Sequence, residues 1–434
     1  MPYRRLPGGL ALQCLESLST RMHALVPEAK TGRRGRPVPR QQEQGVAGAL
    51  GCVAALVSTE DYMAAVGLAL EERPGSAGDG DQAPSPGKSA AAASSAAASA
   101  TAAALCTGLL DLAIGVAAAG AGVPADVLSE CFSSLRAFVE SMPRLLGPRA
   151  ADLVAALRPH VLQGLPEDTR PAQGALRVMG ALLQRLPVQD PALAAQAVSD
   201  IALPALQSPS DAVVAAALGS LSGLEAGWAG LEPAVRSRVL QAALSLGGPA
   251  TRVPASVRAA ACKVLGSLAK PLAAGADMAL LAPMADAFRS AAGEEQQSVR
   301  MAAAWALANL TDALRAAPAA AAAPLVPGLA DSALRLAQDN EKVRAHAVRA
   351  VGHLLALCRS GVSDGCGWAD GALGLLLAAL ETGSVKTQWN ACYAIGALLR
   401  GPDPRQPQRM ADHLPGYIRR LLVLVRSSEY LKIR

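Results

Sequence analysis

The sequence predicts an all-α fold, specifically a right-handed α-solenoid of stacked helical repeats. Three observations lead to this prediction. About half of the 434 residues are hydrophobic, yet only 3% are aromatic, and alanine supplies much of the apolar content. Chains of this composition pack helices closely and form sheets poorly. No long stretch alternates apolar and polar residues as a half-buried strand would, whereas amphipathic helical stripes recur at a regular interval.

Residues 298–312 show the recurring unit most clearly. Ser298 can accept a backbone N–H and so begin a helix. The apolar residues that follow are spaced i, i+3, i+4, i+7, i+8 and i+11, which places them on one helix face. They are Val299, Ala302, Ala303, Ala306, Leu307 and Leu310.

Six helices of this kind occur along the chain. Each contains a small residue that is followed by any one residue and then by Leu. The spacings between the small residues are 39, 47, 42, 44 and 44 residues. Paired helices at a period of about 40–47 residues are typical of HEAT and armadillo repeats. The small residues should let helices of neighbouring repeats approach closely, and stacking buries faces that one pair cannot bury alone. The six structural repeat positions are Gly180, Gly219, Gly266, Ala308, Gly352 and Gly396.

Taken in order, the chain divides into three segments. Residues 1–72 form an N-terminal helical segment, interrupted by a basic loop over residues 30–45. Residues 73–100 are of low complexity, and we expect a disordered insertion there. Residues 101–434 form the repeats, with first helices near residues 278–292, 325–338, 372–381 and 418–427. The apolar run at residues 102–124 carries Asp111 and is mostly Ala and Gly, which favours a buried helix over a membrane span. Because Ile433-Arg434 falls where a seventh second helix would begin, we expect the last repeat to be truncated.

Three strings in the repeats carry a resemblance to a known family. They are residues 299–312 and 342–352, and residues 385–396, in which Trp389-Asn390-Ala391-Cys392-Tyr393-Ala394 is the most specific part. This part of the chain resembles the HEAT repeat-containing protein 6 family over about residues 250–434. The opening residues 2–7 resemble that family's upstream domain of unknown function. The resemblance implies an armadillo-type helical fold and no defined catalytic residues.

The residue patterns favour a protein without catalysis, cofactor, metal or small-molecule substrate. His346 and His353 are seven residues apart, whereas a metal pair on a helix needs i,i+4 spacing with a further ligand nearby. The Gly-x-Ser-x-Gly string at residues 361–365 follows a helix, so we interpret it as an inter-repeat turn. The eight cysteines form no CxxC motif, which suits an intracellular, reducing location in the cytoplasm or nucleus.

Trp305 and Asn309 are the first candidate partner-binding pair. Their i,i+4 spacing places them on one helix face. Armadillo nuclear-import receptors use a similar pair in a groove for basic peptides, but that groove needs a ladder of pairs. The aligned positions here are Arg349/His353 and Tyr393/Ala397. A structural role for Asn309 is therefore the favoured interpretation.

The remaining candidates are basic or aromatic. Arg258, Arg300, Arg344 and Lys386 recur near helix starts and could either line a ladder for an acidic partner or pair with Glu294, Glu295, Asp339 and Glu341. Trp389 and Asn390 complete the candidate set. Residues 1–46 and 397–434 each carry a net charge of +5, but a nucleic-acid surface is usually a denser basic patch with stacking aromatics.

We therefore expect a non-enzymatic scaffold that binds a protein partner through its solenoid surface. One alternative is a transport-type adaptor that binds basic peptides or cargo in the concave groove. A second is a nucleic-acid-associated scaffold that uses the basic ends.

Overall fold

The computed structural model is built from helices. It describes residues 48, 50–51, 86–120, 123–163, 168–248, 253–275, 278–359, 367–399 and 410–428, with residues 86–100 described as backbone. Every element in these ranges is a helix and none is a strand. The predicted all-α solenoid is confirmed.

The chain divides into two compact units. Unit 1 comprises residues 1–189 with 199–205, and unit 2 comprises residues 190–198 with 206–434. In unit 1, helix α5 packs against α8 and α4, and α7 packs against α8. Its helices are α4 (Pro86–Ala118), α5 (Ala125–Ser141), α6 (Pro143–Leu146), η2 (Gly147–Arg149), α7 (Ala150–Leu162), α8 (Arg170–Leu183), α9 (Leu186–Gln189) and α11 (Leu203–Ala205).

Helix α4 differs from the sequence expectation at residues 86–100. These residues lie in the segment predicted to be disordered, yet they form the first half of a 33-residue helix. The physical reason is their alanine content, because Ala has the highest helix propensity of all residues. Residues 73–85, the other part of the predicted insertion, lie outside the described residues.

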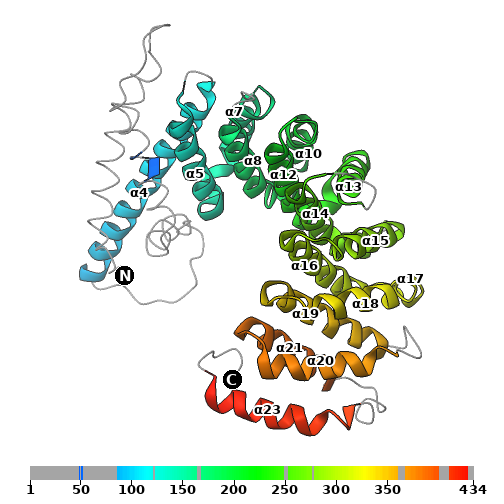
Figure 1. Cartoon of the computed structure of the whole chain (residues 1–434). Helices are drawn as coiled ribbons and strands as arrows, with labels where there is room; N and C mark the ends of the chain where they lie inside the picture. The colour runs from blue at the N-terminus through cyan, green and yellow to red at the C-terminus, as the bar shows by residue number, and fades with distance from the viewer. Residues whose placement is uncertain are drawn as a thin grey trace. The chain divides into compact units, whose positions relative to one another are not determined.

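Unit 2 consists of two parallel layers of helices (Figure 1). Helices α14, α16, α19 and α21 follow one another side by side and form what we call the second-helix layer. Helices α13, α15, α18 and α20 form the first-helix layer, and each packs against its second-layer partner. The described helices of unit 2 are α10 (Pro191–Ala197), α12 (Asp211–Leu221), η4 (Ser222–Gly230), α13 (Pro233–Gly247), α14 (Ala255–Ala273), η5 (Met278–Leu280), α15 (Leu281–Ala291), α16 (Gln297–Leu314), α17 (Ala319–Ala322), α18 (Val326–Leu336), α19 (Glu341–Arg359), α20 (Ala369–Thr382), α21 (Val385–Leu399) and α23 (Leu414–Ser427). Of the short helix η3 (Val198–Ala202), residue 198 belongs to unit 2 and residues 199–202 belong to unit 1.

The core of unit 2 lies between and within the two layers. In α14, 13 of 19 residues are buried, which means that neighbours cover the helix on more than one face. In α23 only Tyr417 and Leu424 are buried. Among the described helices, α23 packs mainly against α20, so only one of its faces is covered. Stacking one repeat on the next therefore supplies most of the burial, as expected for a solenoid.

Glycines at two predicted small positions mark close helix contacts. A Cβ added at Gly266 would lie 2.7 Å from Ala306 Cα, and one added at Gly352 would lie 2.5 Å from Ala394 Cβ. Gly219 differs from this expectation, because no atom lies within 4 Å of an added Cβ and so no other helix approaches it closely. In unit 1 the close contact is at Gly174, where an added Cβ would lie 2.7 Å from Phe132 Cδ2.

Several sequence predictions concern residues outside the described ranges. These are the helices predicted within residues 1–47 and 52–72, the Gly-x-Ser-x-Gly string at 361–365, and the chain end at 429–434.

Cys106, Cys131, Cys262 and Cys392 are free thiols, whereas Cys358 is disulfide-bonded. The sequence contains no CxxC motif, and so the cysteine pattern did not predict the disulfide bond at Cys358.

One described stretch, Asp211–Gly230, is long and apolar enough to cross a membrane by length and composition. More than half of its apolar window is buried inside the protein, at 56%. Core helices of soluble proteins meet the same criterion, so this stretch is weak support for a membrane span.

Candidate functional site

The contacts between neighbouring second helices repeat in register. Gly266 meets Ala306, and Gly352 meets Ala394; in both cases the partner lies two residues before the small position of the next repeat. The two helix pairs therefore share one register, with the same two-residue offset between the contacting positions.

Asn309 is committed to contacts within the layer. Its Nδ2 donates a hydrogen bond to the Gly266 carbonyl oxygen at 3.3 Å, and its Oδ1 accepts one from Arg349 Nη2 at 2.6 Å. Trp305 is half-buried against the same glycine, because a Cβ added at Gly266 would lie 2.9 Å from its ring. The amide of Asn309 thus bridges α14, α16 and α19.

His353 makes the contact that corresponds to that of Asn309, one repeat later. Its Nδ1 lies 3.0 Å from the Ala308 carbonyl oxygen and 3.3 Å from Thr311 Oγ1. Its Nε2 lies 3.8 Å from Asp312, a carboxylate that also pairs with Lys270 at 3.1 Å and Arg315 at 3.3 Å. Burial lowers the pKa of His353 to about 4, although Asp312 and the Ala308 carbonyl act in the opposite direction. His353 is therefore neutral near pH 7.

The repeated arginines join each second helix to the turn of the following repeat. Arg258 pairs with Glu294, and Arg300 pairs with Asp339 through Nε at 2.5 Å and Nη2 at 3.2 Å. Arg300 Nη1 also donates to the carbonyl oxygens of Glu294 and Glu295. Arg300 and Arg344 were predicted as partner contacts, and a role toward a partner stays a prediction for both.

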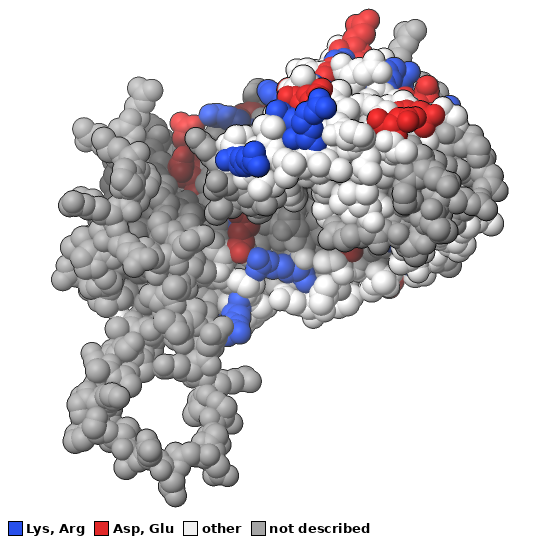
Figure 2. Space-filling model, turned by 90° about the horizontal axis from the view of Figure 1, so that it is seen from below, with Lys and Arg blue, Asp and Glu red and all other residues white. Residues whose placement is uncertain are grey.

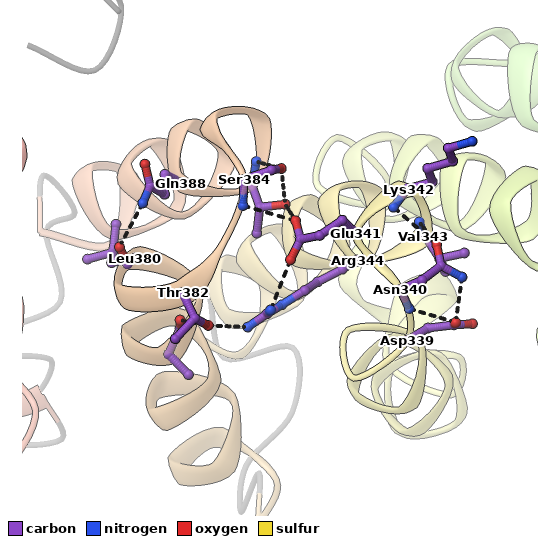
Figure 3. Close-up of polar contacts among 12 residues, drawn as sticks. Asp339, Asn340, Glu341, Lys342, Val343, Arg344, Leu380, Thr382, Ser384 and Gln388 are labelled. Carbon is purple, nitrogen blue, oxygen red and sulfur yellow. Dashed lines mark hydrogen bonds and ion pairs between the residues drawn. The ribbon is translucent and has the colours of Figure 1, made fainter. Parts of the chain in front are cut away.

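The turn before α21 shows the same link in detail (Figure 3). Arg344 pairs with Glu341 at 3.0 Å and donates to Thr382 Oγ1 at 3.2 Å. Glu341 in turn accepts hydrogen bonds from the Ser384 backbone N–H and from Thr387 Oγ1, both at 3.0 Å. Burial raises the pKa of Glu341, but these hydrogen bonds outweigh burial and lower it overall. The carboxylate therefore holds the start of α21.

Trp389 and Asn390 are adjacent in sequence but have different environments. Asn390 is buried, and its Nδ2 donates to the Ala345 carbonyl oxygen at 2.6 Å, so its amide faces α19. Trp389 is 39% exposed, and Tyr393, one helical turn later, is 54% exposed. Val385, one turn before Trp389, is 51% exposed. The accessible aromatic surface on α21 is thus Trp389 with Tyr393.

Four accessible residues, one from each helix of the second-helix layer, share a position in the repeat. Each member lies three residues before its small position, and each is exposed or half-buried. In all four helices, the residue two positions before the small residue is buried. The four accessible residues therefore lie at the edge of the core. We call Lys263, Trp305, Arg349 and Tyr393 the cross-layer row.

Sequence reasoning did not single out Lys263, and it used Arg349 and Tyr393 only as aligned positions. Aligning the repeats on their small residues could have identified this set, because the residue three positions earlier is Lys, Trp, Arg and Tyr in successive repeats. The arrangement offers aromatic and cationic groups for recognition. Among the described residues, no group of three or more His, Cys, Asp or Glu is placed to hold a metal.

No protein-family model matches the chain. Similar solved structures are those of helical-repeat proteins. A mutant of Kap121p is 17% identical with a TM-score of 0.48, over 99% of this chain and 45% of that one. Kap95 in its complex with Nup1 is 13% identical with a TM-score of 0.47, over 96% and 54%. A designed armadillo repeat protein in complex with the peptide (KR)4 is 16% identical with a TM-score of 0.37, over 57% and 98%. The chain spans about half the length of the Kap121p and Kap95 chains.

Proposed function

We propose that this protein is a non-enzymatic interaction scaffold that binds a protein partner on the second-helix layer of unit 2. The observation that supports this proposal most directly is the exposed stripe of Val385, Trp389 and Tyr393 along α21. Large aromatic side chains at a surface are enriched in protein interfaces and supply much of their binding energy. We also propose membership of the HEAT repeat-containing protein 6 family and an intracellular location.

The adaptor for basic peptides receives less support from the same geometry. Its two contact residues are Trp305 and Asn309, and both oxygen and nitrogen of the Asn309 amide are already engaged within the layer. The cross-layer row also carries Lys263 and Arg349, which repel a basic peptide. If Trp305→Ala with Asn309→Ala abolishes binding on a peptide array without loss of fold, the adaptor is supported.

The nucleic-acid alternative depends on basic ends that lie mostly outside the described residues. On the face seen in Figure 2, Lys and Arg side chains are interspersed with Asp and Glu and separated by uncharged surface. A nucleic-acid surface is usually a continuous basic stripe. This face therefore gives no support to that alternative.

Proximity labelling with the full chain tests the scaffold proposal. The test variant is Trp389→Ala with Tyr393→Ala, which removes the exposed aromatic surface of α21. The matched control is Asp331→Ser with Arg335→Ser on α18, which alters two exposed residues of the first-helix layer. We expect partners labelled by the wild type and the control to be lost from the test variant, with unchanged circular dichroism. The same labelled proteins for all three would remove the proposal.

A further inference from the structure

The two layers of unit 2 differ in charge. Helices α14, α16, α19 and α21 together contain nine Lys or Arg and two Asp or Glu, a net charge of +7. Helices α13, α15, α18 and α20 contain four of each sign, a net charge of 0. The positive charge therefore belongs to the layer that also carries the exposed aromatics.

Part of this positive charge is left without a carboxylate partner. Of the eight cations whose side chains the structure describes, four form ion pairs, namely Arg258, Lys270, Arg300 and Arg344. Among the described side chains, Lys263, Lys342, Arg349 and Lys386 have no carboxylate within ion-pair distance. Lys263, Lys342 and Lys386 are exposed, so a partner can reach them.

Arg349 is the least satisfied of these cations. It is half-buried, and its Nη2 donates a hydrogen bond to the neutral amide of Asn309. Its Nε is buried without a hydrogen-bond partner. Burial lowers the pKa of Arg349, and the charge of Asp312, which lies beyond ion-pair distance, acts in the opposite direction. A carboxylate in direct contact with the guanidinium offsets the cost of its lost water.

The positive potential extends from Arg349 to α21. Lys386 Nζ lies 3.3 Å from His346 Nε2, and His346 lies one turn before Arg349 on α19. Burial first, and then the charges of Lys386 and Arg349, lower the pKa of His346 to about 4. His346 is therefore a neutral acceptor for Lys386 near pH 7. The acidic groups on these helices, Asp312 and Glu341, are already engaged with other residues.

We propose that the occupant of the second-helix layer is an extended acidic protein segment, with carboxylates on Lys263, Arg349 and Lys386 and apolar side chains on Trp389 and Tyr393. This inference rests on the scaffold function proposed above. Neighbouring packed helices lie about 8–10 Å apart, so the four-helix row spans roughly 27 Å, or about 9 residues of extended chain.

A peptide fits this surface better than a nucleic acid does. Along the cross-layer row, the half-buried Trp305 on α16 comes between Lys263 on α14 and Arg349 on α19. On α21, the exposed Trp389 and Tyr393 lie on the same helix as Lys386. A chain that alternates carboxylates with apolar groups matches that pattern, whereas a nucleic acid presents a phosphate at every nucleotide and requires a denser basic track.

Fluorescence polarisation with the full chain tests the inference. The probe is a fluorescein-labelled peptide of about 10 residues, long enough to cross the row, in which Glu alternates with Leu. The comparison probes are the same peptide with Lys in place of Glu, and labelled oligothymidylate. We expect the Glu peptide to bind more tightly than either comparison probe, and to bind less tightly as salt increases.

Charge reversal then locates the binding surface. Lys263→Glu with Lys386→Glu should raise the dissociation constant of the Glu peptide on the order of tenfold, because two attractive contacts become repulsive. Arg335→Glu on α18 is the control: Arg335 is exposed, carries the same charge and lies in the other layer. It should leave the dissociation constant unchanged.

Three results overturn the inference. They are tighter binding of the Lys peptide, tighter binding of oligothymidylate, and an unchanged dissociation constant in the double charge-reversal variant. A partner lost from the Trp389→Ala/Tyr393→Ala variant but retained by the charge-reversal variant keeps the scaffold function and removes the acidic specificity.

Discussion

Asn309 and His353 occupy the same position in two successive second helices and make the same contact. Each follows the small residue of its repeat, and each hydrogen-bonds the carbonyl oxygen of the small position in the preceding repeat, Gly266 or Ala308. Those carbonyls already accept bonds inside their own helices, so the side chain uses the second lone pair. Two different residue types therefore serve as one polar link between repeats.

The buried imidazole of His353 makes stability depend on pH. Its pKa is about 4 in the folded protein against 6.5 in the unfolded chain, so only the unfolded state takes up a proton between these values. Stability must therefore fall as pH falls through this window. Asn at position 353 can keep the hydrogen bond to the Ala308 carbonyl oxygen but does not titrate. Between pH 7 and pH 5, the free energy of unfolding of His353→Asn should therefore fall by about 1–2 kcal/mol less than that of the wild type. Urea denaturation at both pH values measures the difference, and equal losses would contradict the assignment.

Gly352 tests the close approach of α19 and α21. A methyl group at this position would lie 2.5 Å from Ala394 Cβ, and neither helix can move a short side chain away. We expect Gly352→Ala to lower the free energy of unfolding by about 1–3 kcal/mol. Gly219→Ala is the matched control because an added Cβ there meets nothing within 4 Å; it should stabilise α12 by about 0.5–1 kcal/mol. Thermal denaturation compares the two, and equal shifts would refute the difference in packing.

At the level of helices, the Arg-to-turn links hold successive repeats together. Arg258 and Arg300 lie eight residues before their small positions and reach carboxylates that precede the next second helix. Arg344 reaches Thr382 at the corresponding turn. These links explain the repeated Val-Arg step as a structural feature, and Lys386 breaks the series because its contact is His346.

The Arg300–Asp339 pair allows one link to be measured. Both side chains are mostly buried, at 23% and 18% exposure, and the hydrogen bond from Arg300 lowers the pKa of Asp339. Arg300→Ala should therefore cost about 1–2 kcal/mol of stability. Arg335→Ala on α18, an exposed residue without a carboxylate partner among the described residues, should cost less than about 0.5 kcal/mol. Equal unfolding midpoints in urea for the two variants would show that the link contributes nothing.

At the scale of unit 2, the first-helix layer and the second-helix layer carry different chemistry. The second-helix layer has a net charge of +7 and the exposed aromatics of α21, whereas the first-helix layer is neutral overall. No continuous segment of the sequence shows this charge difference, because helices of the two layers alternate along the chain. The asymmetry becomes a surface only when every second helix lies beside the next.

The helices, their pairing and the repeat period follow from the pattern of apolar residues along the chain. Apolar spacing fixes which face of each helix is buried, and the recurrence of that face fixes the stacking. The first helices predicted at 278–292, 325–338, 372–381 and 418–427 correspond to α15, α18, α20 and α23 to within a few residues. At 86–100, low complexity predicted disorder, but the helix propensity of alanine prevailed.

The packing of one repeat on the next sets which polar side chains form hydrogen bonds inside the solenoid and which remain accessible to a partner. Asn309 and Asn390 look equally suited to a partner in the sequence, yet both donate to backbone carbonyls of the preceding repeat. Lys263 and Lys386 look like ordinary surface charges in the sequence. In the structure Lys263 belongs to the cross-layer row with Arg349, whose Nε has no hydrogen-bond partner, and Lys386 contacts His346, one turn before Arg349. The reason is physical: a hydrogen bond between repeats depends on the distance between helices some 40 residues apart in the chain, and no local pattern encodes that distance.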